Sequence, residues 1–217
     1  MVQFQLMENQ LMIKRPKLNN QLDEITNEDF LMGDLMSAEV NSLAVSNLEV
    51  NNVEWNECHF KNVVFTDTKI EGVSLIDCIF EHCTLINVNM NSRFIRRCEF
   101  KHCKIMGWDV DKCDLQDVYF GDCNMQYLSL VNSKLRNVTF DSCQLRESRL
   151  FELLLNNVRF VTSDWSESQW YQVPLKTIDI SNCEFHEWQV DASSLKGCII
   201  DETQAPAFIK LLGIEVK

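Results

Sequence analysis

The chain is apolar at every fifth position, without interruption, from Phe30 to Ile200. An α-helix repeats its apolar face every 3.6 residues and a strand every second residue, so a period of five belongs to neither element. The pattern indicates an internal repeat in which the chain turns a corner after every five residues. The apolar residue of each repeat, called the centre below, is then expected to point inward.

All ten cysteines stand two residues before a centre. Val63, Val73 and Val118 occupy the same position elsewhere, which predicts a second inward site where cysteine acts as a small apolar side chain. Zinc sites need short paired spacings such as C-x2-C, and the histidines form no H-x3-5-H pair, so no metal is expected. Cysteines 20 residues apart are close enough for disulfides, but parallel Cβ vectors favour free, buried and inert thiols. The cysteines are Cys58, Cys78, Cys83, Cys98, Cys103, Cys113, Cys123, Cys143, Cys183 and Cys198.

Phenylalanine adds a second period, because it stands at positions 60, 80, 100, 120, 140 and 160. Twenty residues are four repeats, so each turn of the chain has four sides. The rings are then expected to stack at the strand spacing of about 4.8 Å. The sequence therefore predicts an all-β fold over residues 28–201, a square solenoid of roughly 8.5 turns and about 40 Å in length.

Both ends of the chain depart from the frame. Residues 1–27 contain a basic stretch, Lys14 to Lys17, and are expected to form an irregular arm or a cap over the first turn. Residues 202–217 predict a short helix with Asp201 or Thr203 as N-cap and Gly213 as its end. A helix this short needs packing, so part of its apolar surface is expected to cap the last turn and the rest to form a two-fold dimer; a monomeric cap is the alternative. The predicted dimer residues are Phe208, Ile209, Leu211, Leu212, Ile214 and Val216.

One column of like charge is predicted on the surface. Residues 20 apart are neighbours, so Glu147, Glu167 and Glu187 should lie above one another, with Asp164 and Glu184 beside them. Like charges on adjacent strands destabilise a sheet, by up to about 1 kcal/mol each, which favours a role in binding a basic partner. The alternative is a solvated face.

A second column and three unusual inward residues are also predicted. Glu57, Asp77, Arg97 and Asp117 mix signs and predict a solvated ladder. Arg93 at an inward position predicts a bulged wall with Phe94 turned inward. Trp108 and Trp188 stand at small inward positions, which favours a locally widened core over an exposed aromatic binding spot.

Composition limits the classes of function. The net charge of −12 argues against direct nucleic-acid binding and favours basic or DNA-binding protein partners. The N-terminus lacks an apolar signal segment and no run is long enough to span a bilayer, so a cytoplasmic location without membrane association is expected. The usual catalytic and nucleotide-binding motifs are absent and a filled solenoid leaves no cleft, which predicts a protein that is not an enzyme and uses no cofactor.

The repeat resembles the pentapeptide-repeat family, whose pattern is A-(D/N)-L-x-x. Cys113-Asp114-Leu115-Gln116-Asp117 and Cys143-Gln144-Leu145-Arg146-Glu147 match this pattern closely. The resemblance covers residues 30–200 and implies a right-handed quadrilateral β-helix. It says less about function, because function lies in sites and not in folds.

The C-terminal tail is similar to that of the Qnr group of quinolone-resistance proteins. The similarity rests on Gln204-Ala205 and on Leu212-Gly213-Ile214. It implies a tail-to-tail homodimeric rod that imitates B-form DNA and engages type II topoisomerases, DNA gyrase or topoisomerase IV. The frame is unbroken here, whereas many Qnr proteins carry loops that interrupt it, so the chain resembles the loop-free MfpA type. A solenoid scaffold that binds some other protein is the alternative.

Overall fold

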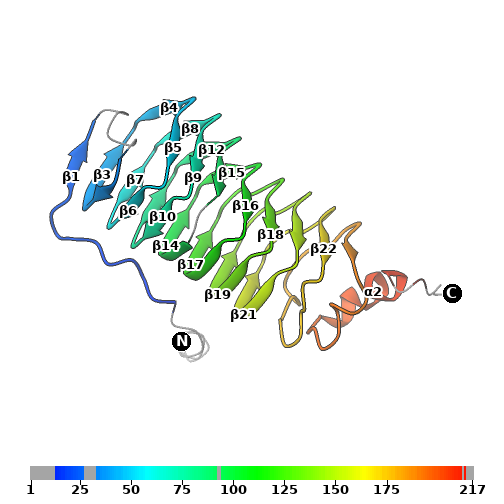
Figure 1. Cartoon of the computed structure of the whole chain (residues 1–217). Helices are drawn as coiled ribbons and strands as arrows, with labels where there is room; N and C mark the ends of the chain where they lie inside the picture. The colour runs from blue at the N-terminus through cyan, green and yellow to red at the C-terminus, as the bar shows by residue number, and fades with distance from the viewer. Residues whose placement is uncertain (1–12, 27–32, 92–93, 212, 214–217) are drawn as a thin grey trace.

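The computed structural model shows a right-handed, four-sided β-solenoid of about eight turns with one short C-terminal helix (Figure 1). It describes residues 13–26, 33–91, 94–211 and 213. We number the four sides by the centres that begin them: Leu35, Val40, Val45 and Val50 begin sides 1, 2, 3 and 4. Each side recurs every 20 residues, as the register of Leu75 with Trp55 and Phe80 with Phe100 shows.

Sides 1 and 2 share one 11-stranded parallel sheet. Side 1 carries β2 (Leu35–Met36), β6 (Glu54–Asn56) and β10 (Ser74–Ile76), and side 2 carries β3 (Ala38–Asn41), β7 (His59–Lys61) and β11 (Ile79–Glu81). Four longer strands run around the corner from side 1 to side 2: β14 (Phe94–Lys101), β17 (Asp114–Gly121), β19 (Lys134–Asp141) and β21 (Leu154–Val161). β1 (Asp23–Ile25) joins the sheet by pairing with β3.

Sides 3 and 4 each have a sheet of their own. Side 3 carries β4 (Ala44–Ser46), β8 (Val64–Thr66), β12 (Thr84–Ile86) and β15 (Lys104–Met106), and isolated bridges continue it. The strands of side 4 are β5 (Glu49–Asn51), β9 (Lys69–Glu71), β13 (Asn89–Asn91), β16 (Asp109–Asp111), β18 (Ser129–Val131), β20 (Arg149–Phe151), β22 (Gln169–Tyr171) and β23 (Gln189–Val190).

The corners explain why five residues make one side. At most corners the residue two positions after a centre adopts a positive φ, as at Asn47 (55°), Asn52 (56°) and Asn62 (51°). Asparagine tolerates this left-handed conformation better than most side chains, and glycine best of all. At Gly72 (φ +68°) the corner has no room for a larger side chain, because a Cβ there would lie 2.7 Å from the side-chain oxygen of Asn52.

The predicted phenylalanine column is present and fills the interior. Successive ring centroids from Phe60 to Phe160 lie 4.5, 4.7, 5.0, 5.0 and 5.6 Å apart, and each successive pair is stacked. Offset stacking of this kind adds to the burial of each ring. The column confirms that one turn contains 20 residues.

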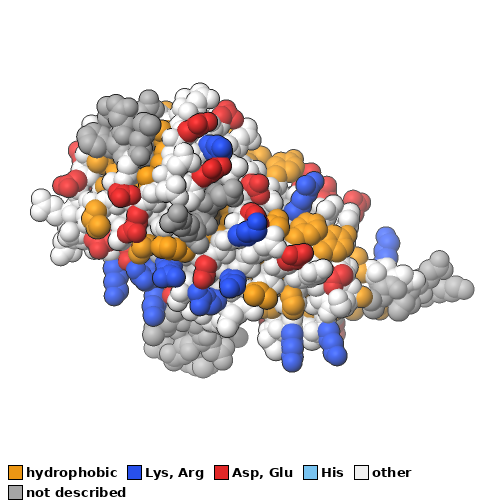
Figure 2. Space-filling view, in the orientation of Figure 1, with side chains coloured by type: hydrophobic (Ala, Val, Ile, Leu, Met, Phe, Trp, Pro, Cys, Tyr) orange, Lys and Arg blue, Asp and Glu red, His pale blue; other side chains and the backbone are white. Residues whose placement is uncertain are grey.

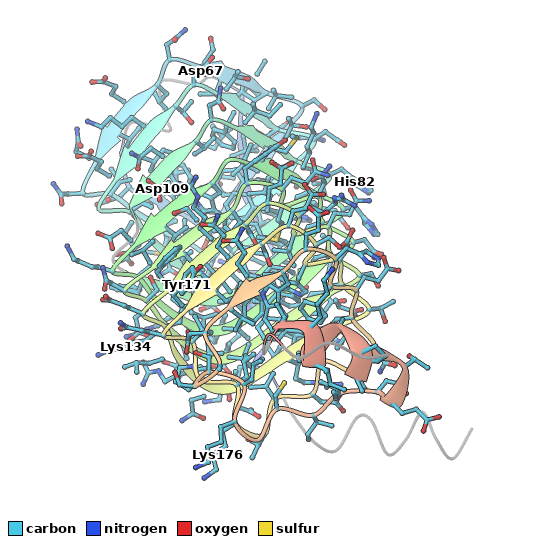
Figure 3. All side chains as sticks on the ribbon, turned by 90° about the vertical axis from the view of Figure 1, so that its right-hand side faces the viewer. Asp67, His82, Asp109, Lys134, Tyr171 and Lys176 are labelled. Carbon is cyan, nitrogen blue, oxygen red and sulfur yellow. The ribbon has the colours of Figure 1, made fainter. Side chains whose placement is uncertain are left out.

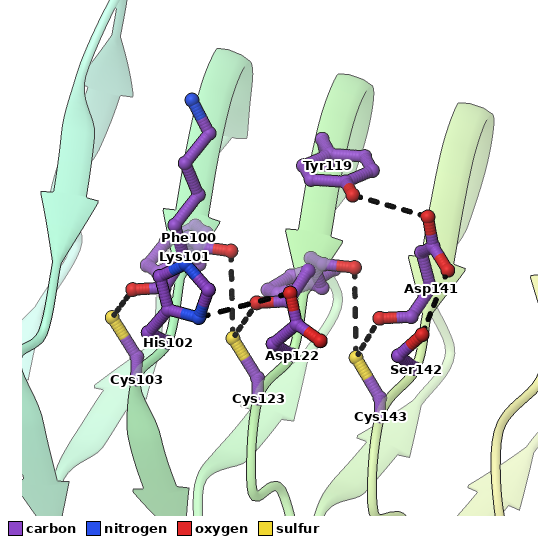
Figure 4. A network of polar contacts seen from close by, with 12 residues as sticks. Phe100, Lys101, His102, Cys103, Tyr119, Asp122, Cys123, Asp141, Ser142 and Cys143 are labelled. Atoms are coloured by element: carbon purple, nitrogen blue, oxygen red, sulfur yellow. Dashed lines mark hydrogen bonds and ion pairs between the residues drawn. The ribbon is translucent and has the colours of Figure 1, made fainter.

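The cysteines also lie where the sequence predicts, as free thiols. All are buried except Cys198, which is half-buried. Several donate to the carbonyl oxygen of a phenylalanine one turn earlier: Cys83 to Phe60 (3.3 Å), Cys123 to Phe100 (3.4 Å) and Cys143 to Phe120 (3.5 Å) (Figure 4). Burial raises the pKa of the Cys113 thiol to about 12, so that thiol stays protonated and unreactive.

The tryptophans at small inward positions lie in the core. Trp108 and Trp188 are buried, which excludes an exposed aromatic binding spot at these residues. Arg93 lies outside the described residues. The expectation that Phe94 turns inward is wrong, because its ring is only half-buried and the Arg96 guanidinium carbon lies 4.7 Å from its centroid, a cation–π contact.

The N-terminal segment, residues 13–25, differs from a simple end cap. β1 does pair with the first turn, but residues 13–17 run along the corner between sides 1 and 2 (Figure 1). The Lys14 amide donates to Asp117 Oδ1 (3.4 Å) and the Lys17 amide to Asp77 Oδ1 (2.9 Å). Three extended residues span about 10 Å, which matches the two turns that separate these aspartates. We call residues 13–17 the strap.

The C-terminal helix closes the other end. A 3-10 turn (Glu202–Gln204) begins with a capping box in which Asp201 accepts from Thr203 N and Gln204 caps Asp201 N, and it leads into α2 (Ala205–Leu211). Phe208 packs against Phe185 and Trp188, with centroids 6.4 and 5.7 Å away. Within the described part of the chain, no helix has the length and apolar character needed to cross a bilayer.

Candidate partner-binding face

The predicted acidic residues meet at the corner between sides 3 and 4. Glu147, Glu167 and Glu187 are corner residues of successive turns, and the hydrogen bonds from Glu147 N to Ser166 O (3.0 Å) and Glu167 N to His186 O (2.7 Å) hold those turns in register. Asp164 and Glu184 are bridge partners on the adjoining part of side 3. We call these five carboxylates the acidic corner.

The backbone does not favour glutamate at these positions. Glu147, Glu167 and Glu187 have φ values of 56°, 61° and 54°, a region that costs most side chains roughly 1–2 kcal/mol and costs asparagine or glycine less. The first turns of the same corner carry Asn47, Asp67 and Asn87 instead. The turn geometry therefore does not require three successive glutamates at this corner, and their exposed side chains place negative charge at the surface.

One arginine partly neutralises the acidic corner. The Arg146 guanidinium forms an ion pair with Glu167 and lies 3.5 Å from Asp164. The hydrogen bond that Arg146 donates to Glu167, followed by the charge of Asp164, raises the pKa of Arg146. Tyr127 is the corner residue one turn before Glu147, and a hydrogen bond to Glu147 raises the pKa of its half-exposed phenol. The column is therefore less repulsive than the sequence alone indicates.

A shallow hollow adjoins the acidic corner across sides 2 and 3. It is lined by backbone and side chains of Gln144, Arg146, Thr162, Asp164, Asn182 and Glu184 among others. The hollow places both amide and carboxylate oxygens beside the Arg146 guanidinium. A partner side chain that enters it would meet acceptors on both flanks, which suits a lysine or arginine.

The second charged column is not the solvated ladder that the sequence predicts. Asp77 and Asp117 are only 5% and 3% exposed because the strap covers them. Arg97 binds Asp77 through Nε (2.7 Å) and Nη2 (2.5 Å), and Asn137 donates to Asp117 (2.9 Å). This corner is a satisfied internal contact and does not offer its charge to a partner.

The predicted dimer residues lie on or just beyond α2. Phe208 covers the last turn of its own chain, Ile209 is half-buried and Leu211 is 38% exposed. Leu212, Ile214 and Val216 lie outside the described residues. Apolar surface on α2 thus remains uncovered in a single chain, which is the feature that a dimer would use.

The histidines and cysteines do not form a reactive centre. His102 stacks on His82 with ring centroids 5.0 Å apart, and its Nδ1 lies 3.7 Å from Asp122 Oδ2 at the outer surface. The Cys103 and Cys123 thiols point into the wall instead (Figure 4). Among the described residues, no group of three or more His, Cys, Asp or Glu side chains is arranged to hold a metal ion.

The sequence also matches a known family. Residues 73–150 and 93–170 match the model of the pentapeptide repeat region. The same frame and the same four-sided wall continue on both sides of the matched segment. The matched segment, residues 73–170, is therefore a pentapeptide repeat region, and it forms part of the β-solenoid. The sequence has no significant match among curated proteins.

Two solved structures are similar to this chain at low sequence identity. A trypsin-treated variant of QnrB1, a plasmid-mediated fluoroquinolone resistance protein, is 18% identical with a TM-score of 0.41, over 85% of this chain and 99% of that chain. HetL, a pentapeptide repeat protein involved in heterocyst differentiation regulation in the cyanobacterium Nostoc sp. strain PCC 7120, is 10% identical with a TM-score of 0.32, over 76% and 90%. These values do not indicate a partner for this chain.

Two contacts of these regions escaped the sequence analysis. Arg146 and Glu167 are 21 residues apart, one more than a turn, so their contact is diagonal and a search at intervals of 20 misses it. The aspartates under the strap pair with a segment outside the repeat, at separations of 60 and 103 residues. No periodic signal in the sequence points to such a contact.

Proposed function

We propose that this repeat scaffold imitates DNA through its acidic corner. It binds the basic DNA-binding surface of a type II topoisomerase, either DNA gyrase or topoisomerase IV. Binding modulates or protects that enzyme and confers quinolone resistance. The observation that carries the proposal is the row of glutamates at 147, 167 and 187, kept at left-handed corners where the backbone favours asparagine.

The charge density of the acidic corner supports a DNA-like surface. The acidic corner holds five carboxylates over three turns of about 4.8 Å each, or about one carboxylate per 2.9 Å before the charge of Arg146 is counted. Duplex DNA carries one charge per about 1.7 Å of axis. A basic saddle shaped for DNA would therefore meet a comparable, though somewhat weaker, field along the rod.

The tail supports the choice of partner. Gln204-Ala205 and Leu212-Gly213-Ile214 are similar to the tail of the Qnr group, and Gln204 has a structural task here that explains its place. Its amide Nε2 donates to Ile180 O (3.1 Å) and Cys183 O (2.8 Å), which fixes α2 on the last turn. With α2 fixed, its uncovered face would join two chains tail to tail and lengthen the anionic rod.

A supercoiling assay with purified DNA gyrase tests this function, with and without a quinolone. Wild-type protein should either inhibit supercoiling by gyrase or reduce the inhibition of gyrase by the quinolone. Either effect should become weaker as the salt concentration is raised. The triple variant Glu147→Gln, Glu167→Gln, Glu187→Gln should need at least roughly tenfold more protein, since each lost charge pair weakens binding.

The matched control removes as much charge elsewhere. Glu24→Gln, Glu49→Gln, Asp109→Asn changes three exposed carboxylates away from the acidic corner and should behave as wild type. If wild type has no effect on gyrase or on topoisomerase IV, or if both triple variants lose activity equally, the proposal is wrong. The chain would then be a scaffold for a different protein.

A further inference from the structure

Charge is segregated across the C-terminal half of the rod, residues 130–200. Sides 3 and 4 and their corners carry the acidic corner together with Glu152 and Asp191, against two cations, Arg146 and Arg149. Sides 1 and 2 carry five cations, Lys134, Arg136, Arg159, Lys176 and Lys196, against two carboxylates, Asp141 and Asp179. Figure 2 shows Lys and Arg side chains gathered along the lower edge of the molecule.

Side 1 holds the densest part of this positive surface. Lys134, Arg136, Lys176 and Lys196 all lie on it, and we call them the basic facet. Lys134 and Lys176 project from the same edge in the view of Figure 3. Lys134, Lys176 and Lys196 are exposed and form no ion pair with any described residue, whereas Arg136 binds Asp114 (2.7 Å). Three cations on one side of an acidic protein are thus left for an outside partner.

An apolar spot lies within the basic facet. Leu154 is in register with Lys134 and is 62% exposed. The next residue, Leu155, is a centre but only half-buried, unlike Leu135 and Leu175 on the adjacent turns, which are buried. An exposed leucine beside Lys134, on a side that carries other cations, resembles the mixed surface of a protein–protein contact more than a phosphate-binding surface.

The backbone beside Leu154 has an unpaired edge. β21 pairs with β19 on one side only, and no backbone hydrogen bond joins it to residues 174–182 of the next turn. Pro174 contributes to this seam because it has no N–H. On sides 3 and 4 the ladder continues across the same two turns, from Trp165 N to Glu184 O (2.9 Å) and from Gln189 N to Ser168 O (2.9 Å).

We propose that the basic facet binds an extended acidic segment of a partner protein, which lies across side 1 over Leu154. The lysines would bind its carboxylates, and Leu154 would contact one apolar side chain. This site lies on the side opposite the acidic corner and does not depend on the proposed topoisomerase function.

The test uses fluorescence anisotropy with the full-length protein and a labelled 12-residue peptide that alternates glutamate with valine. Wild type should bind in low salt, and Lys134→Glu, Lys176→Glu should weaken binding at least roughly tenfold through charge repulsion. Leu154→Ser should weaken it several-fold with no change in salt dependence. The control Lys104→Glu, Arg149→Glu reverses two exposed cations on sides 3 and 4 and should bind as wild type.

Two further probes separate the alternatives. A 20-base-pair DNA duplex and vesicles with anionic lipid serve as the other anions. Tighter binding of either than of the peptide, or a loss of peptide binding in the control variant, would overturn the proposal.

Discussion

At the scale of the residue, the packed core has room only for a small side chain at most positions two residues before a centre. Cys103 illustrates this, because its thiol is buried and donates to Phe80 O (3.4 Å) within a filled layer. Val63 occupies the same position on side 3 two turns earlier and is equally buried. The layer therefore requires a small side chain, and sulfur chemistry plays no part.

Cys103→Val should consequently be tolerated, whereas Cys103→Leu should overpack the layer. We expect a loss of about 1–3 kcal/mol in the free energy of unfolding for leucine and less than about 1 kcal/mol for valine. Urea unfolding of both variants and wild type measures this. An equal loss for both would mean that the thiol hydrogen bond, and not the volume, matters at this site.

Asp191 should make stability depend on pH in the acid range. Burial would raise its pKa, but hydrogen bonds from Ser193, Gln172 N and Ser194 outweigh it and lower the pKa to about 2, from 3.8. Because the folded pKa is depressed, its contribution is present above pH 3.8 and is lost as pH falls toward 2. Asp191→Asn should lower the melting temperature at pH 6 and converge on wild type near pH 2. A constant difference between the two proteins at every pH would contradict this.

At the scale of the element, the C-terminal helix depends on a single polar anchor. α2 has no buried residue, and Gln204 connects it to Ile180 and Cys183 through two hydrogen bonds. Gln204→Ala should therefore cost about 1–3 kcal/mol and speed hydrogen exchange in residues 178–211, because two carbonyls lose their donor. Gln189→Ala, which removes an exposed amide, is the control. Unchanged exchange in the Gln204 variant would show that Phe208 holds the helix alone.

The strap is an element that the sequence could not place. It has no repeat, and its two amide hydrogen bonds go to aspartates 60 and 103 residues away. The wall could be predicted because each turn repeats the same local requirements: a large centre, a small residue before it and a corner after it. Periodicity gave the four sides and the phenylalanine column, and cap residues gave the helix. Contacts between the repeat and a non-repeating segment leave no such pattern.

Asp117 offers a direct check on the strap. Asp117→Asn keeps the shape of the side chain but removes the charge that accepts from Lys14 N, and Asn137 can still contact it. The strap should loosen, so trypsin should cut after Lys17 at least several-fold faster, since cleavage follows the population of the opened segment. Asp122→Asn, one exposed carboxylate on the next corner, is the control. Equal cleavage rates would mean that packing alone retains the strap.

At the scale of the whole molecule, sequence periodicity sets the shape and departures from it set the surfaces. Every turn has the same interior, so the partners of the rod must be chosen by outward residues, and these differ between opposite sides. Sequence columns located the acidic corner correctly. They missed its neutralisation by Arg146, because that contact runs diagonally between turns. They also missed the seam beside β21, because apart from Pro174 the residues there keep the same apolar frame as every other turn.

The uncovered face of α2 leads to a prediction about the assembly of two rods. Leu211 is 38% exposed on a helix without any buried residue, at the C-terminal end of the solenoid. A tail-to-tail dimer would cover that face by two-fold symmetry. Leu211→Asp should then convert a dimer into a monomer in sedimentation velocity at micromolar protein, because burial of an unpaired carboxylate opposes association. Lys210→Gln, a change of the neighbouring exposed residue, should leave the dimer intact. A wild-type monomer at all concentrations would show that α2 serves as a cap alone, and the anionic rod would then act singly.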